Sequence, residues 1–490
     1  MAKITAVIDI GSNSARMAVF KKTSHFGFVL LKEIKSRVRI SEGAYENNGE
    51  LQEFAINRAI NALKEFLLIA KSLKARKILA VATSAVRDAP NKSIFLSRVK
   101  KELGLNIKVI DGEKEAFFGA VAASNLLPNN NGITIDIGGG STEFALIQDK
   151  KIIDKISLKL GTVRLKELFF DKNDIKGAKK YIDSELSKLP NSFITDTIFG
   201  IGGTIRALSK AIMQKNEYPL DILHGFKYNF KNEKKFLELI INATENELKE
   251  LGFKEERLDV IRQGTLILLQ SIEKLQAKQI VTSGVGVREG VFLSDLLRNS
   301  NYIFPKNFNP SVRSIEDIYQ IDKKISNYEA NLAIKLFDIL KPIHKIDDKY
   351  KIHLRYAMKL SLAGSYIDFY SSHKHTNYVL LNSLNYGFSH EDRILISKII
   401  RYHKKKKIKK EYLSIYKQLA PEKKVLETLC YIFWLTKILN TNLSLQKLEL
   451  NVDNETLLIK GENLYLAKEE LMKNQKYKII QIILYSPYYN

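Results

Sequence analysis

Short apolar runs alternate with segments of helical spacing along the first 300 residues of the chain. The apolar runs predict an opening hairpin at 6–20 and further strands at 28–34, 77–82 and 106–110. Between them, apolar positions recur every three or four residues, which predicts helices at 50–73, 91–103 and 113–124. The segment TSAVRDAPN follows the strand at 77–82 and is expected to be a loop. This order of elements indicates an α/β fold.

The opening hairpin is repeated further along the chain. Segment 133–147, ITIDIGGGSTEFALI, has a strand, a glycine turn and a returning strand, in the same order as 6–20, AVIDIGSNSARMAVF. A shift of 127 residues brings identical residues together: Ile8 and Ile135, Asp9 and Asp136, Gly11 and Gly138, and Ser14 and Ser141. Two such units predict two related lobes that face each other across a cleft, each contributing one glycine turn.

The second lobe continues with helices near 174–189 and 232–249 and a strand, glycine turn and helix at 197–210. After residue 300 the pattern changes: only three of the 25 glycines lie there, and the apolar spacing is helical to about 440. The remaining tail predicts a hairpin, a helix and a last strand. We therefore expect four domains: a first lobe at 1–130, a second lobe at 131–305, a helical domain at 306–440 and a small α+β domain at 441–490.

The chain carries a formal charge of +24, from 78 basic and 54 acidic residues. Such a charge favours encounters with polyanions such as polyphosphate, nucleic acid or an anionic membrane. The single Cys430 excludes intramolecular disulfides and fits a reducing cytosol. No secretory signal and no apolar run of membrane-spanning length is visible, so we expect a cytoplasmic protein without a membrane partner.

The glycine turns are candidate phosphate-binding loops, because glycine lets backbone amides point outward and Ser or Thr adds hydroxyl donors. We assign phosphate contacts to both turns and to the helix start near 203: Gly11, Ser12, Asn13, Ser14, Gly138, Gly139, Gly140, Ser141, Gly203 and Thr204. Three carboxylates flank the turns: Asp9, Asp136 and Glu143. We expect them to bind Mg²⁺ or another divalent cation, directly or through water.

Arg87 is a candidate for binding the transferred phosphoryl group. It follows the strand at 77–82, and ligands of α/β sheets bind at the loops after the carboxyl ends of strands. A guanidinium can hold two phosphate oxygens with parallel hydrogen bonds. Neither histidine nor cysteine lies in these segments to activate a nucleophile, so direct attack by water is expected rather than a covalent phosphoenzyme.

Eight segments in order carry a resemblance to a known family: IDIGSNSARM, VRISEGA, ATSAVRDAPN, IDGEKEAFFGAV, IDIGGGSTEF, GTVRL, GIGGTIRALS and SGVGVREG. They resemble the exopolyphosphatase and guanosine pentaphosphate phosphatase family, in the superfamily of actin and sugar kinases. The resemblance covers roughly the first 300 residues. It implies two ribonuclease H-like, actin-like ATPase lobes around a cleft, and a homodimer.

The resemblance also implies the reaction: release of terminal phosphate from inorganic polyphosphate, from pppGpp to give ppGpp, or from both. By the same resemblance, Glu115 in GEKEA is the base that orients the water, with Glu113 as a possible partner. Where the family more commonly has a glutamate between them, this chain has Lys114. Arg39, in VRISEGA, is a further phosphate contact.

The helical part resembles the HD-like domain of longer family members, through SHKHTNYVLLNS at 372–383 and RYHKK at 401–405. Where that domain would place its metal-binding His-Asp pair, this chain has Ser361 and Leu362. The ligand set is therefore incomplete, and we interpret His373, His375 and His403 as packing or anion-contact residues.

The same region carries a run of cations at a predicted helix end. Arg401, Lys404, Lys405, Lys406 and Lys407 form a candidate track for a long polyanion, since several distant phosphates would gain affinity by counterion release. A solvated helix end is the simpler alternative. No specific nucleic acid is expected as a partner.

Two other functions stay open at this point. An ATP-dependent kinase of the same superfamily would need an acceptor, because the fold alone does not decide the reaction. A non-catalytic polyanion-binding regulator would not need the carboxylates that this chain retains. The sequence leaves the preference between linear polyphosphate and a guanosine nucleotide undecided.

Overall fold

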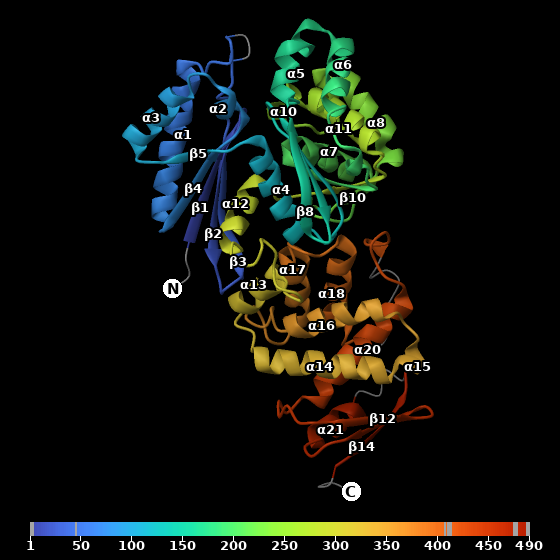
Figure 1. The fold of residues 1–490 in the computed structure, drawn as a ribbon. Helices are drawn as coiled ribbons and strands as arrows, with labels where there is room; N and C mark the ends of the chain where they lie inside the picture. Colours follow the sequence, from blue (N-terminus) through green and yellow to red (C-terminus); the bar gives the residue numbers. More distant parts are fainter. Residues whose placement is uncertain (1–3, 45–46, 406–407, 409–413, 474–478, 487–490) are drawn as a thin grey trace. The chain divides into compact units, whose positions relative to one another are not determined.

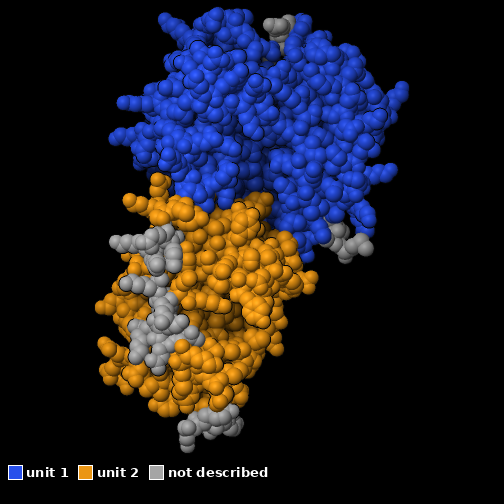
Figure 2. Space-filling view, turned by 180° about the vertical axis from the view of Figure 1, so that it is seen from behind, with its two compact units in different colours: residues 1–308 blue, residues 309–490 orange. Residues whose placement is uncertain are grey.

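The computed structural model describes residues 4–44, 47–405, 408, 414–473 and 479–486. The chain divides into two compact units, residues 1–308 and 309–490, which Figure 2 colours separately. Each unit is described by itself. Within the described residues, none of the helices is both long and apolar enough to span a bilayer.

The first unit contains two sheets (Figure 1). The first sheet has the order β3-β2-β1-β4-β5, with these bounds: β1 Ile4–Ile10, β2 Ala15–Lys22, β3 Phe28–Ser36, β4 Lys77–Ala82 and β5 Ile107–Val109. Its first three strands are antiparallel neighbours, whereas β1, β4 and β5 run parallel. Ile8 and Ile10 pack with Phe66 of α1 (Glu53–Ser72) and Phe95 of α3 (Lys92–Leu103) in one core.

The second sheet has the order β10-β11-β9-β6-β7-β8. Its strands are β6 Gly132–Ile137, β7 Thr142–Gln148, β8 Lys151–Leu158, β9 Thr197–Ile201, β10 Lys227–Asn229 and β11 Gln279–Thr282. Its helices include α5 Thr162–Leu168, α6 Ile175–Leu186, α7 Gly202–Lys215, α8 Phe230–Asn242, α9 Glu245–Glu250, α10 Glu255–Leu258 and α11 Ile261–Leu275. Alternate residues of β6, such as Ile133 and Ile135, face the core that these helices build.

The predicted internal repeat is confirmed in the strand register. In β1 and β2, Ile10 pairs with Ala15, and in β6 and β7, Ile137 pairs with Thr142. Both turns close with the same hydrogen bond: the Gly11 amide donates to the Ser14 carbonyl at 3.1 Å, and Gly138 to Ser141 at 3.0 Å. The two hairpins therefore present equivalent turns, one from each sheet.

Two helices connect the sheets by packing across them. Ala120 and Ala123 of α4 (Gly112–Leu126) lie in one cluster with Phe199 of the second sheet. Helix α12 (Val287–Leu296) packs against α4 and against the first sheet, where Phe292 stacks on Phe20 with ring centroids 4.4 Å apart. The division of the unit at residue 130 stays a prediction, and a helix from each side of it packs on the sheet of the other side.

The second unit is helical with a small sheet. Its helices are α13 Pro310–Ile318, α14 Lys323–Ile339, α15 Lys341–His344, α16 Lys351–Leu360, α17 Ser372–Ser383, α18 His390–Tyr402, α20 Lys423–Leu439 and α21 Tyr465–Lys473. Strands β12 Glu449–Asp453, β13 Thr456–Lys460 and β14 Gln481–Tyr485 form the sheet in the order β12-β13-β14. The predicted helical region and the α+β tail are both present, while the boundary predicted at residue 440 stays untested.

Two local predictions were wrong. Residues Ser84–Asp88 of the predicted loop form the short helix α2, in which the Arg87 amide donates to the Thr83 carbonyl at 2.9 Å. The single helix expected near 232–249 is two helices. Thr244 and Glu247 form a reciprocal capping box that starts α9 after α8 has ended.

Candidate active site

A cavity of about 140 Å³ lies where the two glycine turns meet the starts of α7 and α12. This volume is below the roughly 300–1,000 Å³ of a site that encloses a whole drug-sized ligand. Five basic side chains line it: Arg16, Lys35, Arg206, Arg257 and Arg288. Three acidic side chains line it as well: Asp9, Glu115 and Asp136. The cavity is therefore suited to the phosphate end of a larger anion.

Most of the predicted phosphate contacts line this cavity: Gly11, Ser12, Asn13, Ser14, Gly138, Gly139, Ser141, Gly203 and Thr204. The two turns approach closely, since a Cβ added to Gly139 would lie 2.9 Å from the Ser12 Cβ. Gly140 is the exception among the turn residues. It does not line the cavity, and its carbonyl accepts a hydrogen bond from Arg164 Nε at 3.0 Å.

Asp9 and Asp136 hold equivalent positions at the ends of β1 and β6, and both line the cavity. Burial, together with other nearby carboxylates, raises the pKa of Asp9 and brings that of Asp136 to about 6, despite opposing arginines. Carboxylates that repel one another in a polar cavity suit a divalent cation, and Mg²⁺ needs only one or two of them when substrate oxygens complete its shell. The two aspartates therefore fit the expected ion.

Glu143 was expected to share that ion, but it does not line the cavity. It is the cross-strand partner of Asp136, and its carboxylate accepts a hydrogen bond from the Ser157 hydroxyl at 2.8 Å. Burial raises the pKa of Glu143 to about 7. Within the described part of the chain, no three His, Cys, Asp or Glu side chains converge closely enough to hold a metal by themselves. Of the three predicted ligands, only Asp9 and Asp136 line the cavity, and the metal role of the set stays a prediction.

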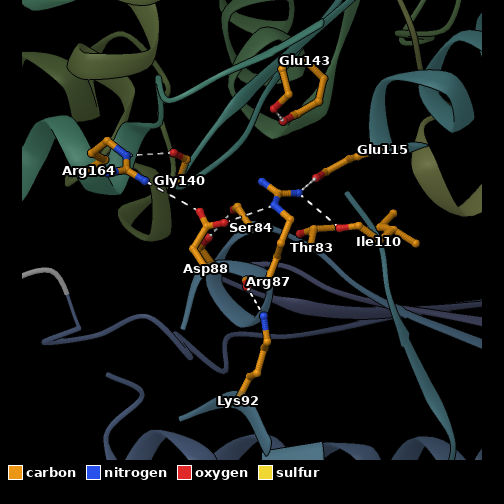
Figure 3. Close-up of polar contacts among 12 residues, drawn as sticks. Thr83, Ser84, Arg87, Asp88, Lys92, Ile110, Glu115, Gly140, Glu143 and Arg164 are labelled. Carbon is orange, nitrogen blue, oxygen red and sulfur yellow. Dashed lines mark hydrogen bonds and ion pairs between the residues drawn. The ribbon is translucent and has the colours of Figure 1, made fainter. Parts of the chain in front are cut away.

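Glu115 lines the cavity and pairs with Arg87, which lies outside the cavity lining (Figure 3). Glu115 stands in the first turn of α4, and its carboxylate is 3.2 Å from Arg87 NH1. Burial and the neighbouring Glu143 and Asp9 raise the pKa of Glu115 well above its usual value, while Arg87 opposes the shift. A buried carboxylate with a raised pKa beside a phosphate cavity is a candidate general base.

Arg87 is held in place by several acceptors. Its Nε lies 3.2 Å from Asp88, and its NH1 also approaches the Ile110 carbonyl at 3.4 Å. Figure 3 shows Asp88 between Arg87 and Arg164, the residue that binds the Gly140 carbonyl. Burial lowers the pKa of Arg87, but Glu115 and Asp88 outweigh it and raise the value overall, so the guanidinium stays charged.

Glu113 was predicted as a partner of Glu115, and the structure does not bring it to the cavity. Its side chain is 65% exposed and pairs with Lys155 at 2.9 Å. Residues two apart on a helix point about 200° apart, so only one of the two glutamates can face the cavity. The helix rotation selects Glu115.

Arg39 does not line the cavity either. Its guanidinium pairs with Asp259 of the second lobe at 3.1 Å. Its part in phosphate binding stays a prediction.

Sequence reasoning missed all five cavity cations: Arg16, Lys35, Arg206, Arg257 and Arg288. Three of these stand inside the segments IDIGSNSARM, GIGGTIRALS and SGVGVREG, so their position in those segments was the available signal. Arg206 is fixed by its own backbone neighbours, because it donates to the carbonyls of Gly202 at 3.1 Å and Gly284 at 3.0 Å. Burial lowers its pKa to about 10.

The predicted polyanion track lies partly outside the described residues. Lys406 and Lys407 are not described, whereas Arg401 belongs to α18 and Lys404 and Lys405 are exposed beyond it. The track stays a prediction.

Two of the three histidines nearby, His373 and His403, lie with ring centroids 6.0 Å apart. Burial lowers their pKa values to about 4 and about 3, so they are neutral near pH 7 and add no charge to the track.

Models of known families match both units. The Ppx/GppA phosphatase family matches residues 18–299, and domain III of the Ppx/GppA phosphatases matches residues 309–477. A guanosine-5'-triphosphate,3'-diphosphate pyrophosphatase of Pseudoalteromonas translucida is 28% identical over 82% of this chain and 80% of its own length. A bifunctional 3-dehydroquinate synthase/phosphatase of Fusobacterium nucleatum is 31% identical, and the match spans 57% of this chain and 45% of that relative.

Solved structures resemble about three fifths of the chain. The Aquifex aeolicus member of the Ppx/GppA family is 32% identical, with a TM-score of 0.53 over 61% of this chain and 99% of that one. An exopolyphosphatase of Cytophaga hutchinsonii is 25% identical, with a TM-score of 0.56 over 60% of this chain and 98% of its own. These neighbours have the actin-like fold that the sequence resemblance implied, and neither the kinase nor the regulator alternative finds support among the relatives.

Proposed function

Because this chain belongs to the Ppx/GppA phosphatase family and is therefore a hydrolase of phosphoanhydride bonds, we propose that it converts guanosine pentaphosphate to the tetraphosphate. The observation that carries the proposal is the largely buried Glu115 beside Arg87, at a cavity lined by two glycine turns. Relatives that match about four fifths of their length to this chain are named for that reaction.

Inorganic polyphosphate is the second candidate substrate. The exopolyphosphatase of Cytophaga hutchinsonii supports it, as does the excess of basic residues in the cavity. Both substrates present a terminal phosphate joined by an anhydride bond, so the cavity chemistry is the same for each.

In the proposed mechanism, a water molecule attacks the terminal phosphorus and Glu115 accepts its proton. The bond between that phosphorus and the bridging oxygen breaks, and the shortened anion leaves. The amides of the two turns and Arg87 hold the oxygens on which charge gathers. A Mg²⁺ ion bound by Asp9 and Asp136 would supply further neutralisation of that charge. No serine needs to form a covalent intermediate.

The test is phosphate release by the purified full chain from pppGpp and from long polyphosphate, each with and without Mg²⁺. Wild-type protein should release phosphate without any acceptor, and Glu115→Gln should lower the rate by about 10²–10⁴-fold. Glu113→Gln is the matched control, because that side chain is exposed on the same helix turn. Loss of less than about threefold in Glu115→Gln would remove Glu115 from the role of base.

One further expectation accompanies this proposal. The homodimer implied by the family resemblance stays a prediction, which the mass of the purified protein in solution tests directly. Phosphate release that required an added acceptor would instead favour the kinase alternative.

A further inference from the structure

Three cations lead away from the cavity along the end of β3: Lys35, Arg37 and Arg39, here called the cation row. Lys35 lines the cavity and is the cross-strand partner of Arg16, another lining residue. Arg37 and Arg39 follow it at alternate positions outside the cavity lining. The cation row therefore begins at the site and continues past it.

Two carboxylates of the second lobe now pair with the cation row. Lys35 Nζ lies 3.0 Å from Glu256, and the NH2 groups of Arg37 and Arg39 lie 3.0 Å and 3.1 Å from the same oxygen of Asp259. Glu256 and Asp259 are three residues apart at α10, so they face the same side. Two carboxylates thus pair with all three cations of the row.

This pairing leaves polar atoms unsatisfied. Arg37 Nε and Asp259 Oδ1 are buried and have no hydrogen-bond partner among the described residues. Asp259 offers one oxygen to two guanidinium groups, although each guanidinium can bind an oxyanion through two parallel hydrogen bonds. An anion with several oxygens would use these donors more fully than one carboxylate does.

The backbone beneath the cation row is fixed to the first phosphate-binding turn. The Arg39 amide donates to the Asn13 carbonyl at 3.0 Å, and Arg58 NH2 donates to the Arg39 carbonyl at 3.0 Å. These bonds hold Arg39 at a φ of 41°, in the left-handed region that non-glycine residues rarely adopt. The row is therefore built in a set position relative to the turn that receives the terminal phosphate.

We propose that the cation row is a subsite for the distal phosphates of a long chain, beyond those that tripolyphosphate can place, and that Glu256 and Asp259 occupy it in place of substrate. The proposal rests on the second candidate substrate of the proposed function, polyphosphate, and extends it to the length of the phosphate chain. A ligand with a long run of phosphates displaces the two carboxylates, whereas a short one leaves them paired. The cation row would therefore select ligands by the length of their phosphate chain and not by the identity of a nucleobase.

The alternative role for the same ion pairs is to close the two lobes, with no contact to substrate. In that case, removal of a carboxylate would weaken the binding of every substrate to the same degree. The two roles therefore predict opposite effects of one substitution.

The test measures binding of tripolyphosphate and of long polyphosphate to the full chain in a Glu115→Gln background, where the ligand is not consumed. Asp259→Asn should strengthen the binding of long polyphosphate by about two- to fivefold, because the variant lacks the carboxylate that competes for the cation row. Arg37→Gln should weaken the binding of long polyphosphate by a similar factor and make that binding less dependent on salt. Neither substitution should change the binding of tripolyphosphate. Asp196→Asn is the control, since it removes an exposed pair with Lys278 away from the cavity lining.

Equal weakening of both ligands by Asp259→Asn, or an unchanged length preference in Arg37→Gln, would overturn the subsite. Its failure is distinguishable from failure of the proposed function. If the wild-type protein hydrolyses its substrates but Arg37→Gln leaves the binding of long polyphosphate unchanged, the subsite is refuted and the proposed function stands. If Arg37→Gln weakens the binding of long polyphosphate but the wild-type protein hydrolyses neither pppGpp nor polyphosphate, the proposed function is refuted and the binding subsite stands.

Discussion

Removing the charge of Arg87 should shift the pH dependence of hydrolysis upward. Glu115 must be deprotonated to accept a proton from water, so the rate rises as pH increases through its pKa. Arg87 favours the charged form of Glu115 and lowers that pKa. In Arg87→Gln the lowering is lost, and the acid limb of the profile moves to higher pH.

The size of the shift follows from the geometry. Two unit charges about 4 Å apart interact by about 4 kcal/mol at an effective dielectric constant of about 20, which corresponds to roughly three pKa units. The 3.2 Å contact between Arg87 and Glu115 is close to that separation, but the side chains are 19% and 12% exposed, so solvent screens part of it. We therefore expect Arg87→Gln to raise the pKa of Glu115, by less than this unscreened interaction would give.

The assay is kcat/KM for phosphate release across the acid and neutral range, with each profile normalised to its own plateau. Normalisation separates the shift from any loss of substrate affinity. Arg98→Gln is the matched control, because Arg98 is a paired arginine of the same lobe with no contact to the site. A lower plateau with an unmoved acid limb would show that the titrating group is not Glu115 or that Arg87 does not act on it.

Three further predictions follow from other contacts. Asp136→Asn should raise the Mg²⁺ concentration for half-maximal rate by at least about tenfold, because the variant lacks one of two direct ligands, and an unchanged Mg²⁺ titration would place the ion elsewhere. Gly290→Ala should destabilise the first unit by about 1–3 kcal/mol in urea unfolding, since a Cβ there would lie 1.8 Å from the Phe118 carbonyl oxygen, and wild-type stability would mean that α4 and α12 separate easily. Changing the lysines of 401–410 to glutamine should weaken long polyphosphate, flatten its salt dependence and spare pppGpp, whereas equal losses would exclude an extended track.

The turns and the strands around them could be predicted from sequence because their determinants are local. Glycine after a strand and an aspartate at its end recur with the same spacing, and the register places Asp9 and Asp136 at equivalent positions. The same local signals gave a wrong prediction at residues 84–88, because the sequence of a polar loop resembles that of a short helix. Residues 84–88 contain helix-compatible residues between Thr83 and a proline, and only the observed hydrogen bonds identify α2.

The tertiary structure decided which side chains meet. The sequence alone determined two glycine turns and a repeated aspartate, because strand and turn patterns depend on neighbours in the chain. The role of Glu115 came from the resemblance of its segment to a known family. The choice between Glu113 and Glu115 depends on how α4 is rotated when it packs on the second sheet. The arginines around the cavity come from four separate segments, and Arg39 turns to Asp259, 220 residues away. Such contacts arise from the packing of distant elements, and no local spacing encodes them.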